Sequence, residues 1–140
     1  MCGITGFIIS DGGGNVNWNN ALHLMTDRLS HRGPNSDGYY YERNNNFIAG
    51  FGHRRLSIID LSENANQPMK NEDDTVIVVF NGEIYNYKRQ AEELIRAGHQ
   101  FKSNSDTEVI IHLYEDYKER CLDKLDGMFA FALLDRLKNQ

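Results

Sequence analysis

The chain has none of the long apolar runs, leader features or basic clusters that mark several classes of protein. No apolar stretch approaches the ~20 residues needed to cross a bilayer, and no basic segment followed by an apolar one precedes a secretory cleavage site. The formal net charge is −5, and no cluster of Lys and Arg stands out against it, which disfavours nucleic acid as a partner. We therefore expect a cytoplasmic protein that binds neither membranes nor nucleic acid.

Cysteine is equally scarce. The two cysteines, Cys2 and Cys121, lie far apart without a CxxC or His-spaced pattern, so neither a disulfide framework nor a zinc site is indicated. The five histidines show no ligand spacing, and Gly12-Gly13-Gly14 lacks the sequence context of a phosphate-binding loop. The sequence thus predicts no metal site and no ATP site in this chain, and it predicts Cys121 to be a small core residue.

The hydrophobic pattern predicts a single domain that mixes strands and helices. With 140 residues, 40% of them apolar and 25% charged, the chain is long enough to bury a core and has an ordinary globular composition. Strands are predicted at 4–9, 39–42, 47–52, 75–80 and 128–135, and helices at 18–30, at 88–97 up to Gly98, and after Ser105. This order of elements favours a layered α+β fold.

Two details of this prediction concern element ends. The Asn81-Gly82 pair after the apolar run 75–80 is a turn signal, so the strand is expected to stop there. Ser105-Asp106-Thr107-Glu108 has the form of a capping box and is expected to open a helix. The apolar face of that helix is predicted to carry Val109, Ile110, Leu113, Tyr114 and Tyr117.

The first residues place a thiol where it has unusual chemistry. If Met1 is removed after synthesis, Cys2 carries its thiol and a free α-amino group on the same residue. An ordinary thiol has a pKa of about 8.5 and an α-amine a pKa of about 7.7 to 8.0, so the amine can accept the thiol proton at little cost. Nucleophile and base are then one residue, although a chance cysteine at position 2 is the plainer interpretation of this feature taken alone.

Three polar clusters offer what an amide-hydrolysing cysteine needs, and each also has a purely structural interpretation. Arg54 or Arg55 is suited to hold a substrate carboxylate, or the two form a solvated surface pair. Asn81 and the Gly82 amide form a candidate oxyanion hole, or a simple turn. Asp106 is a candidate partner for a substrate ammonium group, or a local helix cap.

Taken together, six motifs carry a family resemblance. MCGITGF at position 1, HRGPNSDG at 31, GHRRLSIIDL at 52, FNGEIYNY at 80, SNSDTEVI at 103 and LDGMFAFAL at 125 occur in this order. The chain resembles the class II glutamine amidotransferase domain of glutamine-hydrolysing asparagine synthetases, which are N-terminal-nucleophile (Ntn) hydrolases. The resemblance extends from residue 1 to about residue 136 and implies a four-layer αββα sandwich with the active site at one end of two facing sheets.

The resemblance also implies a role for each matching residue. Cys2 is implied as the nucleophile that forms a γ-glutamyl thioester with glutamine, with its own amine as the base. Asn81 and Gly82 are implied as the oxyanion hole, Arg55 rather than Arg54 as the ligand of the glutamine carboxylate, and Glu83 and Asp106 as the ligands of the α-ammonium group. The residues implied to line the pocket are Leu56, Ser57, Ile58 and Ile59.

The resemblance further implies a longer enzyme. Members of the family continue with more strands of the sandwich and then with a synthetase domain that uses ATP and Mg²⁺, so 1–140 is expected to be a C-terminally truncated amidotransferase domain. The HRRLSIID and YNY forms resemble the asparagine-synthetase-like branch, whose acceptor is aspartate or another carboxylate, including sugar and peptide acceptors.

Truncation gives further expectations. The last strand, 128–135, is expected to lie at an exposed sheet edge, so association of two chains is a hypothesis. The alternatives to an active glutaminase are a catalytically incompetent remnant that binds glutamine or a partner, and a general Ntn amidohydrolase. The paired charges Arg55 and Asp106 disfavour the latter, because they suit an amino-acid substrate.

Overall fold

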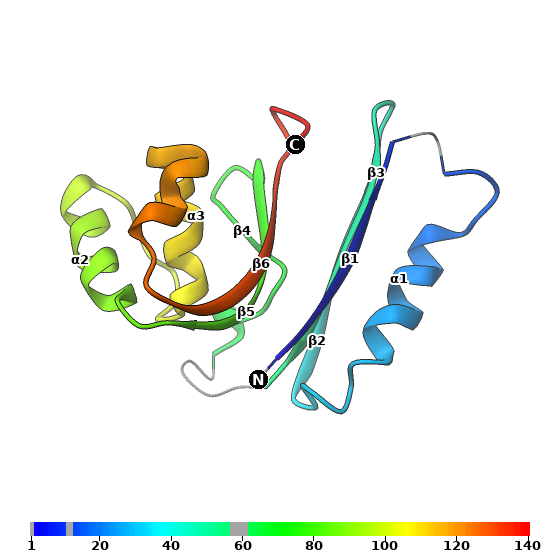
Figure 1. Cartoon of the computed structure of the whole chain (residues 1–140), viewed down its shortest axis with the longest axis horizontal. Coiled ribbons are helices and arrows are strands. Elements are labelled where there is room, and N and C mark those ends of the chain that lie inside the picture. Colours follow the sequence, from blue (N-terminus) through cyan, green and yellow to red (C-terminus); the bar gives the residue numbers. More distant parts are fainter. Residues whose placement is uncertain (1, 11–12, 57–61) are drawn as a thin grey trace.

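The protein is a stack of four layers, two sheets enclosed between helices (Figure 1). The computed structural model describes residues 2–10, 13–56 and 62–140. One sheet has the order β1-β3-β2 and the other β4-β5-β6, with antiparallel pairing throughout. The predicted αββα sandwich is confirmed.

The helices cover the outer faces of the two sheets. In Figure 1, α1 lies on the outer side of the β1-β3-β2 sheet, and α2 and α3 lie on the outer side of the other sheet. The elements of the first half are β1 (Gly3–Ile9), α1 (Trp18–Asp27), β2 (Ser36–Arg43), β3 (Ile48–Arg55) and the short 3₁₀ helix η1 (Glu63–Ala65). Those of the second half are β4 (Met69–Lys70), β5 (Val76–Ile84), α2 (Tyr87–Ala97), α3 (Asp106–Tyr117), the 3₁₀ helix η2 (Lys118–Lys124) and β6 (Gly127–Asp135).

Strand β5 is buried on both faces, and this accounts for its nearly continuous apolar sequence. Its alternate residues Ile77 and Val79 pack between the two sheets against Phe51 of β3. Val78 and Phe80 point the other way and pack with residues of α3. The period of two therefore divides β5 between two separate cores.

The expected stop at Asn81-Gly82 is wrong. Strand β5 continues to Ile84, and Asn81 and Gly82 pair with Ala130 and Phe129 of β6. A Cβ on Gly82 would lie 2.5 Å from the Phe129 side chain, so glycine is required here for close approach of the strands. Pairing with β6 prevails over the local turn preference of this dipeptide.

Helices α1 and α2 begin close to the predicted positions, and α2 also ends where predicted. Gly98 ends α2 in the left-handed conformation, with φ of +109°, as expected. Helix α1 ends at Asp27 instead of residue 30, because Leu29, Ser30 and Arg32 form single turns with carbonyls three residues earlier.

Helix α3 opens at Ser105, whose hydroxyl accepts a hydrogen bond from the Thr107 amide. The reciprocal half of the expected capping box is absent among the hydrogen bonds described, because the Glu108 carboxylate accepts from the amides of Lys102 and Ser103 instead. Tyr117, predicted on the apolar face, is 42% exposed, since it lies at the last turn of α3 beyond the packed helix face.

Two other predictions concern Cys121 and the sheet edge. Cys121 is buried in η2, as predicted. Strand β6 lies at an edge of its sheet in the described part of the chain, with Met128 exposed. Association through this edge stays a prediction that a strictly monomeric mass in solution would contradict.

Within the described residues, no helix combines the length and apolar character needed to cross a membrane.

Candidate active site

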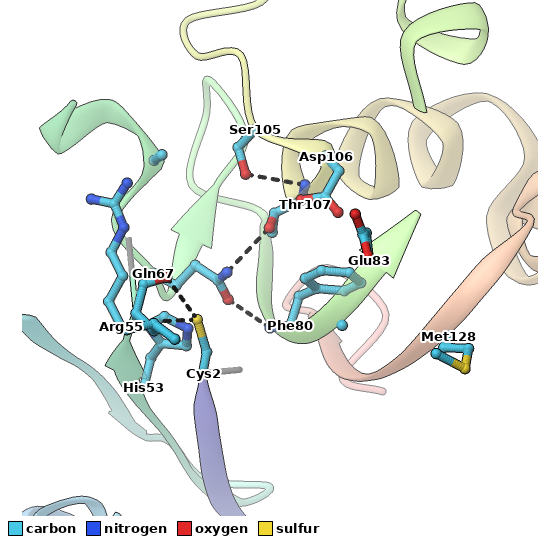
Figure 2. A pocket seen from close by; sticks show the side chains of 13 residues that line it. Cys2, His53, Arg55, Gln67, Phe80, Glu83, Ser105, Asp106, Thr107 and Met128 are labelled. Carbon is cyan, nitrogen blue, oxygen red and sulfur yellow. Dashed lines mark hydrogen bonds between the residues drawn. The ribbon is translucent and has the colours of Figure 1, made fainter. Parts of the chain in front are cut away.

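Cys2 lies directly before β1, and its side chain lies near those of His53 and Arg55 from the end of β3 (Figure 2). Its Sγ atom accepts a hydrogen bond from the Leu56 amide at 3.3 Å and lies 3.7 Å from the Leu56 carbonyl oxygen. The Arg32 guanidinium donates to the Cys2 carbonyl at 3.1 Å. Backbone and side-chain contacts from two distant segments thus fix Cys2 at the start of β1.

The thiol borders a cavity of about 240 Å³. Six of the residues predicted for the site line this cavity, and they come from four separate parts of the chain. They are Cys2, Arg55, Leu56, Gly82, Glu83 and Asp106. The other predicted pocket residues, Ser57, Ile58 and Ile59, lie outside the described residues.

Arg55 is placed by the end of β3. The two-residue alternation of this strand puts Phe51, His53 and Arg55 on the face directed at the second sheet. Arg55 is only 7% exposed, and its Nη1 donates to the Ser62 carbonyl at 2.8 Å and to Asn66 Oδ1 at 2.7 Å. These bonds hold the guanidinium group at the side of the cavity.

Arg54 has a different environment from its neighbour. It is paired with Asp27 of α1 and Asp37 of β2, and it does not line the cavity. The alternation of β3 separates the two arginines, so only Arg55 borders the space next to Cys2. Arg54 thus holds α1 and β2 to β3, and the substrate-binding role that the resemblance implies for Arg55 stays a prediction.

Two carboxylates lie on the opposite side of the cavity from Arg55 (Figure 2). Asp106, the first residue of α3, is 5% exposed, and its Oδ2 accepts from the Ile84 amide at 3.0 Å. Burial raises the pKa of Asp106, and the nearby Glu83 adds to this, while backbone amides including that of Ile84 oppose it. The cavity therefore has a cationic and an anionic side, with the thiol between them.

The two predicted oxyanion-hole residues have different positions. Gly82 lines the cavity, whereas Asn81 does not. The Asn81 Oδ1 atom is buried and has no hydrogen-bond partner among the described residues. Its assigned role stays a prediction.

Gln67 is a residue of the site that the sequence reasoning missed. It is 8% exposed, its Oε1 accepts from the Phe80 amide at 2.6 Å, and its Nε2 donates to the Thr107 hydroxyl at 3.1 Å. It thereby joins β5 to the start of α3, directly beside Gly82 and Asp106. A single glutamine in a loop carries no local signal for such a bridge.

His53 is a second missed residue. It is 1% exposed and lines the cavity. Burial, aided by the neighbouring Arg55 charge, lowers its pKa to about 4, so the imidazole is neutral near pH 7. His53 and Arg55 are two residues apart in β3, so the alternation of side chains predicts that they lie on the same face. This spacing could have identified His53 from the sequence.

Comparison with known proteins points to one family. The family model described as "Glutamine amidotransferase domain" matches residues 1–140. The chain is 48% identical over 115 residues to asparagine synthetase [glutamine-hydrolyzing] 1 of Bacillus subtilis (strain 168), covering 82% of this chain and 17% of the relative. It is 51% identical over 112 residues to asparagine synthetase [glutamine-hydrolyzing] 2 of Arabidopsis thaliana, covering 79% of the chain and 18% of the relative.

A solved structure shares the fold. The glutamine phosphoribosylpyrophosphate amidotransferase of B. subtilis, complexed with ADP and GMP, superimposes with a TM-score of 0.72 over 97% of this chain and 35% of the other, at 19% identity. At this identity the likeness concerns the fold alone. The chain spans less than a fifth of the length of the two asparagine synthetases described above.

Proposed function

Since the chain belongs to the glutamine amidotransferase domain family, we propose that it hydrolyses glutamine to glutamate and ammonia through a thioester on Cys2. One observation carries this proposal. The thiol borders a cavity with Arg55 on one side and Glu83 and Asp106 on the other. An α-amino acid has a carboxylate and an ammonium group, and this arrangement offers each of them a partner of opposite charge.

The reaction needs a free amine at Cys2, and therefore the removal of Met1. The amine accepts the thiol proton as Sγ attacks the side-chain amide carbon of glutamine, and a bond forms between sulfur and carbon. The bond between carbon and nitrogen then breaks, the amine returns the proton to the departing nitrogen, and ammonia leaves. Water attacks the thioester, giving glutamate and restoring the thiol.

The negative charge on the amide oxygen needs hydrogen-bond donors during both attacks. Gly82 is at the cavity and its backbone amide is the first candidate, with the Asn81 side chain as the second. Such a donor contributes about 2.7 to 4 kcal/mol of transition-state stabilisation. The Gln67 bridge supports this edge of the cavity, because it holds the Phe80 amide directly before Asn81.

The relatives suggest what happens to the ammonia. We extend the proposal to a longer protein in which a synthetase domain outside this chain uses ATP and Mg²⁺ to amidate aspartate or a related carboxylate. The support for it is the similarity to two asparagine synthetases described as glutamine-hydrolyzing. Glutamine and this domain are then the partners of 1–140.

The test measures ammonia release from glutamine by protein whose intact mass shows that Met1 is absent. Release that disappears in Cys2→Ala, and in a sample that retains Met1, is the expected result. Glutamine binding without any release from correctly processed protein would overturn the proposal. It would favour the remaining candidate, a catalytically incompetent module that binds glutamine or a partner.

A further inference from the structure

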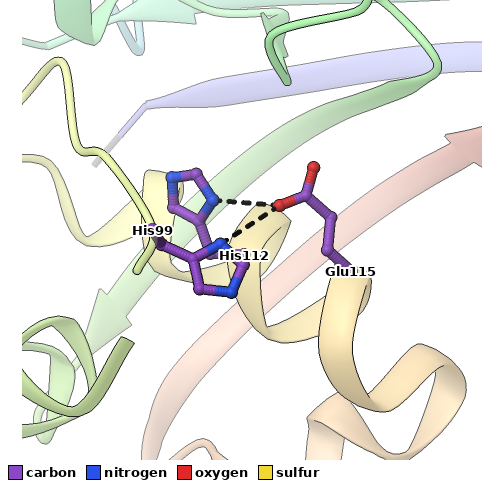
Figure 3. Close-up of side chains that lie close together, drawn as sticks. All are labelled: His99, His112 and Glu115. Atoms are coloured by element: carbon purple, nitrogen blue, oxygen red, sulfur yellow. Dashed lines mark hydrogen bonds and ion pairs between the residues drawn. The ribbon is translucent and has the colours of Figure 1, made fainter. Parts of the chain in front are cut away.

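Two histidines and one glutamate form a cluster where the segment after α2 meets α3 (Figure 3), and none of the three lines the cavity. His99 follows Gly98, the residue that ends α2. His112 and Glu115 lie three residues apart on α3, so they face the same side of that helix. One donor atom from each of the three lies within 4.8 Å of the others.

The distances within the cluster are those of a preformed ligand set. Glu115 Oε2 is 3.1 Å from His112 Nδ1 and 3.5 Å from His99 Nδ1. Ligand atoms at 2.0 to 2.1 Å from a tetrahedral zinc ion are separated by about 3.3 Å from one another. Two of the three pairs therefore have a spacing close to that of a tetrahedral site, and all three donor atoms lie within 4.8 Å of one another.

Each of the three groups also has a polar contact on its other atom. Asp116 Oδ1 is 3.2 Å from His99 Nε2, and Glu108 Oε1 is 3.7 Å from His112 Nε2. Asn71 Nδ2 donates to Glu115 Oε1 at 2.9 Å. Metal-binding histidines commonly donate their second ring nitrogen to a carboxylate, which fixes the tautomer and turns the free nitrogen toward the ion. The contact of His99 with Asp116 has this geometry, whereas His112 Nε2 is buried without a hydrogen-bond partner among the described residues.

The cluster combines rigidity with access. His112 is 2% exposed, which fixes it in the core, whereas the side chains of His99 and Glu115 are 18% and 26% exposed. An ion can therefore enter from solvent on the side of His99 and Glu115. A water molecule can complete the coordination there, because three protein ligands leave a fourth position open.

We propose that His99, His112 and Glu115 form a binding site for a divalent transition metal such as Zn²⁺. Two imidazoles and one carboxylate suit zinc, cobalt or nickel, while magnesium and calcium prefer sets made of oxygen alone. None of the three lines the Cys2 cavity. The ion joins the segment after α2 to the middle of α3, and so ties two elements together without entering the glutaminase chemistry.

The competing explanation is a metal-free cluster of histidines paired with carboxylates. Calorimetric titration of Zn²⁺ into the full chain carrying Cys2→Ala distinguishes the two explanations, because this variant removes the partly buried Cys2 thiol as an alternative zinc ligand. We expect one equivalent to bind and the melting temperature to rise with it. Absence of a stoichiometric binding event, or of a melting shift, would overturn the proposal.

Substitution identifies the ligands. His99→Gln, at the more accessible position, is expected to weaken Zn²⁺ binding at least 100-fold, because loss of an outer contact alone typically costs about 10 to 100-fold. The matched control is His31→Gln, since His31 is exposed and outside the cluster. Unchanged affinity in His99→Gln, with a folded protein shown by its circular dichroism, would assign the ion to another place and refute the site.

Discussion

Replacing Gln67 by alanine should weaken the fold at the edge of the active site. The side chain is buried and bonds simultaneously to the Phe80 amide of β5 and the Thr107 hydroxyl of α3. Alanine has no side-chain oxygen, so the buried Phe80 N–H loses the acceptor that Gln67 Oε1 provides. The shorter side chain also leaves a small void beside the cavity. Both β5 and α3 carry residues assigned to the substrate, so the effect should reach activity as well as stability.

The magnitude follows from the two lost bonds. A buried backbone donor left without a partner costs about 1 to 3 kcal/mol, and the second, ordinary hydrogen bond contributes about 0.5 to 1.5 kcal/mol. We therefore expect the free energy of unfolding to fall by about 2 to 4 kcal/mol in Gln67→Ala. For a chain of this size that corresponds to a melting temperature lower by roughly 6 to 12 °C.

Urea denaturation monitored by circular dichroism measures this loss, and two variants serve as controls. Gln67→Met has nearly the same volume but no polar atoms, so most of the loss should persist if the hydrogen bonds cause it. Gln100→Ala removes an exposed glutamine and should change stability by less than about 0.5 kcal/mol. A wild-type value in Gln67→Ala, or full recovery in Gln67→Met, would refute the reasoning.

Two further predictions concern the neighbours of this bridge. Arg55→Lys should raise the KM for glutamine by about 10 to 100-fold with little change in kcat, while Arg54→Lys should leave KM unchanged, and steady-state ammonia release measures both. The folded-state pKa of His53 is lowered from 6.5 to about 4, so the unfolded state takes up the proton first. The contribution of neutral His53 to the free energy of unfolding is therefore complete above about pH 6.5 and is lost as the pH falls toward about 4. Between about pH 7.5 and about pH 5, the free energy of unfolding measured in urea titrations should fall by about 2 kcal/mol less in His53→Gln than in the wild type. Equal losses would contradict this assignment.

Local patterns were sufficient to predict most of the elements. The apolar runs at 4–9 and 75–80 and the left-handed cap at Gly98 are set by residues close in sequence. The failures occur where a distant partner decides. Asn81-Gly82 is a turn by its own preference, but β6 lies alongside and extends β5 through it.

The site divides in the same way. Cys2, the pair Arg54 and Arg55, and Asp106 were candidates from the sequence alone, whereas the resemblance selected Arg55 and supplied Glu83. The Gln67 bridge and the pairing of His99 with His112 depend on chain segments meeting only in the fold. No periodicity within either segment records such a meeting, so these features became visible only with the structure.

The placement of the site makes its geometry depend on how the two sheets pack. The first sheet contributes the thiol and Arg55, whereas Gly82 and Glu83 come from β5 of the second and Asp106 from the helix that covers it. The distance between the cationic and anionic sides is therefore set by the apolar layer that includes Phe51 and Val79. Tightly packed cores transmit volume changes to their surroundings. A substitution in this layer should consequently alter substrate binding without touching any residue of the cavity.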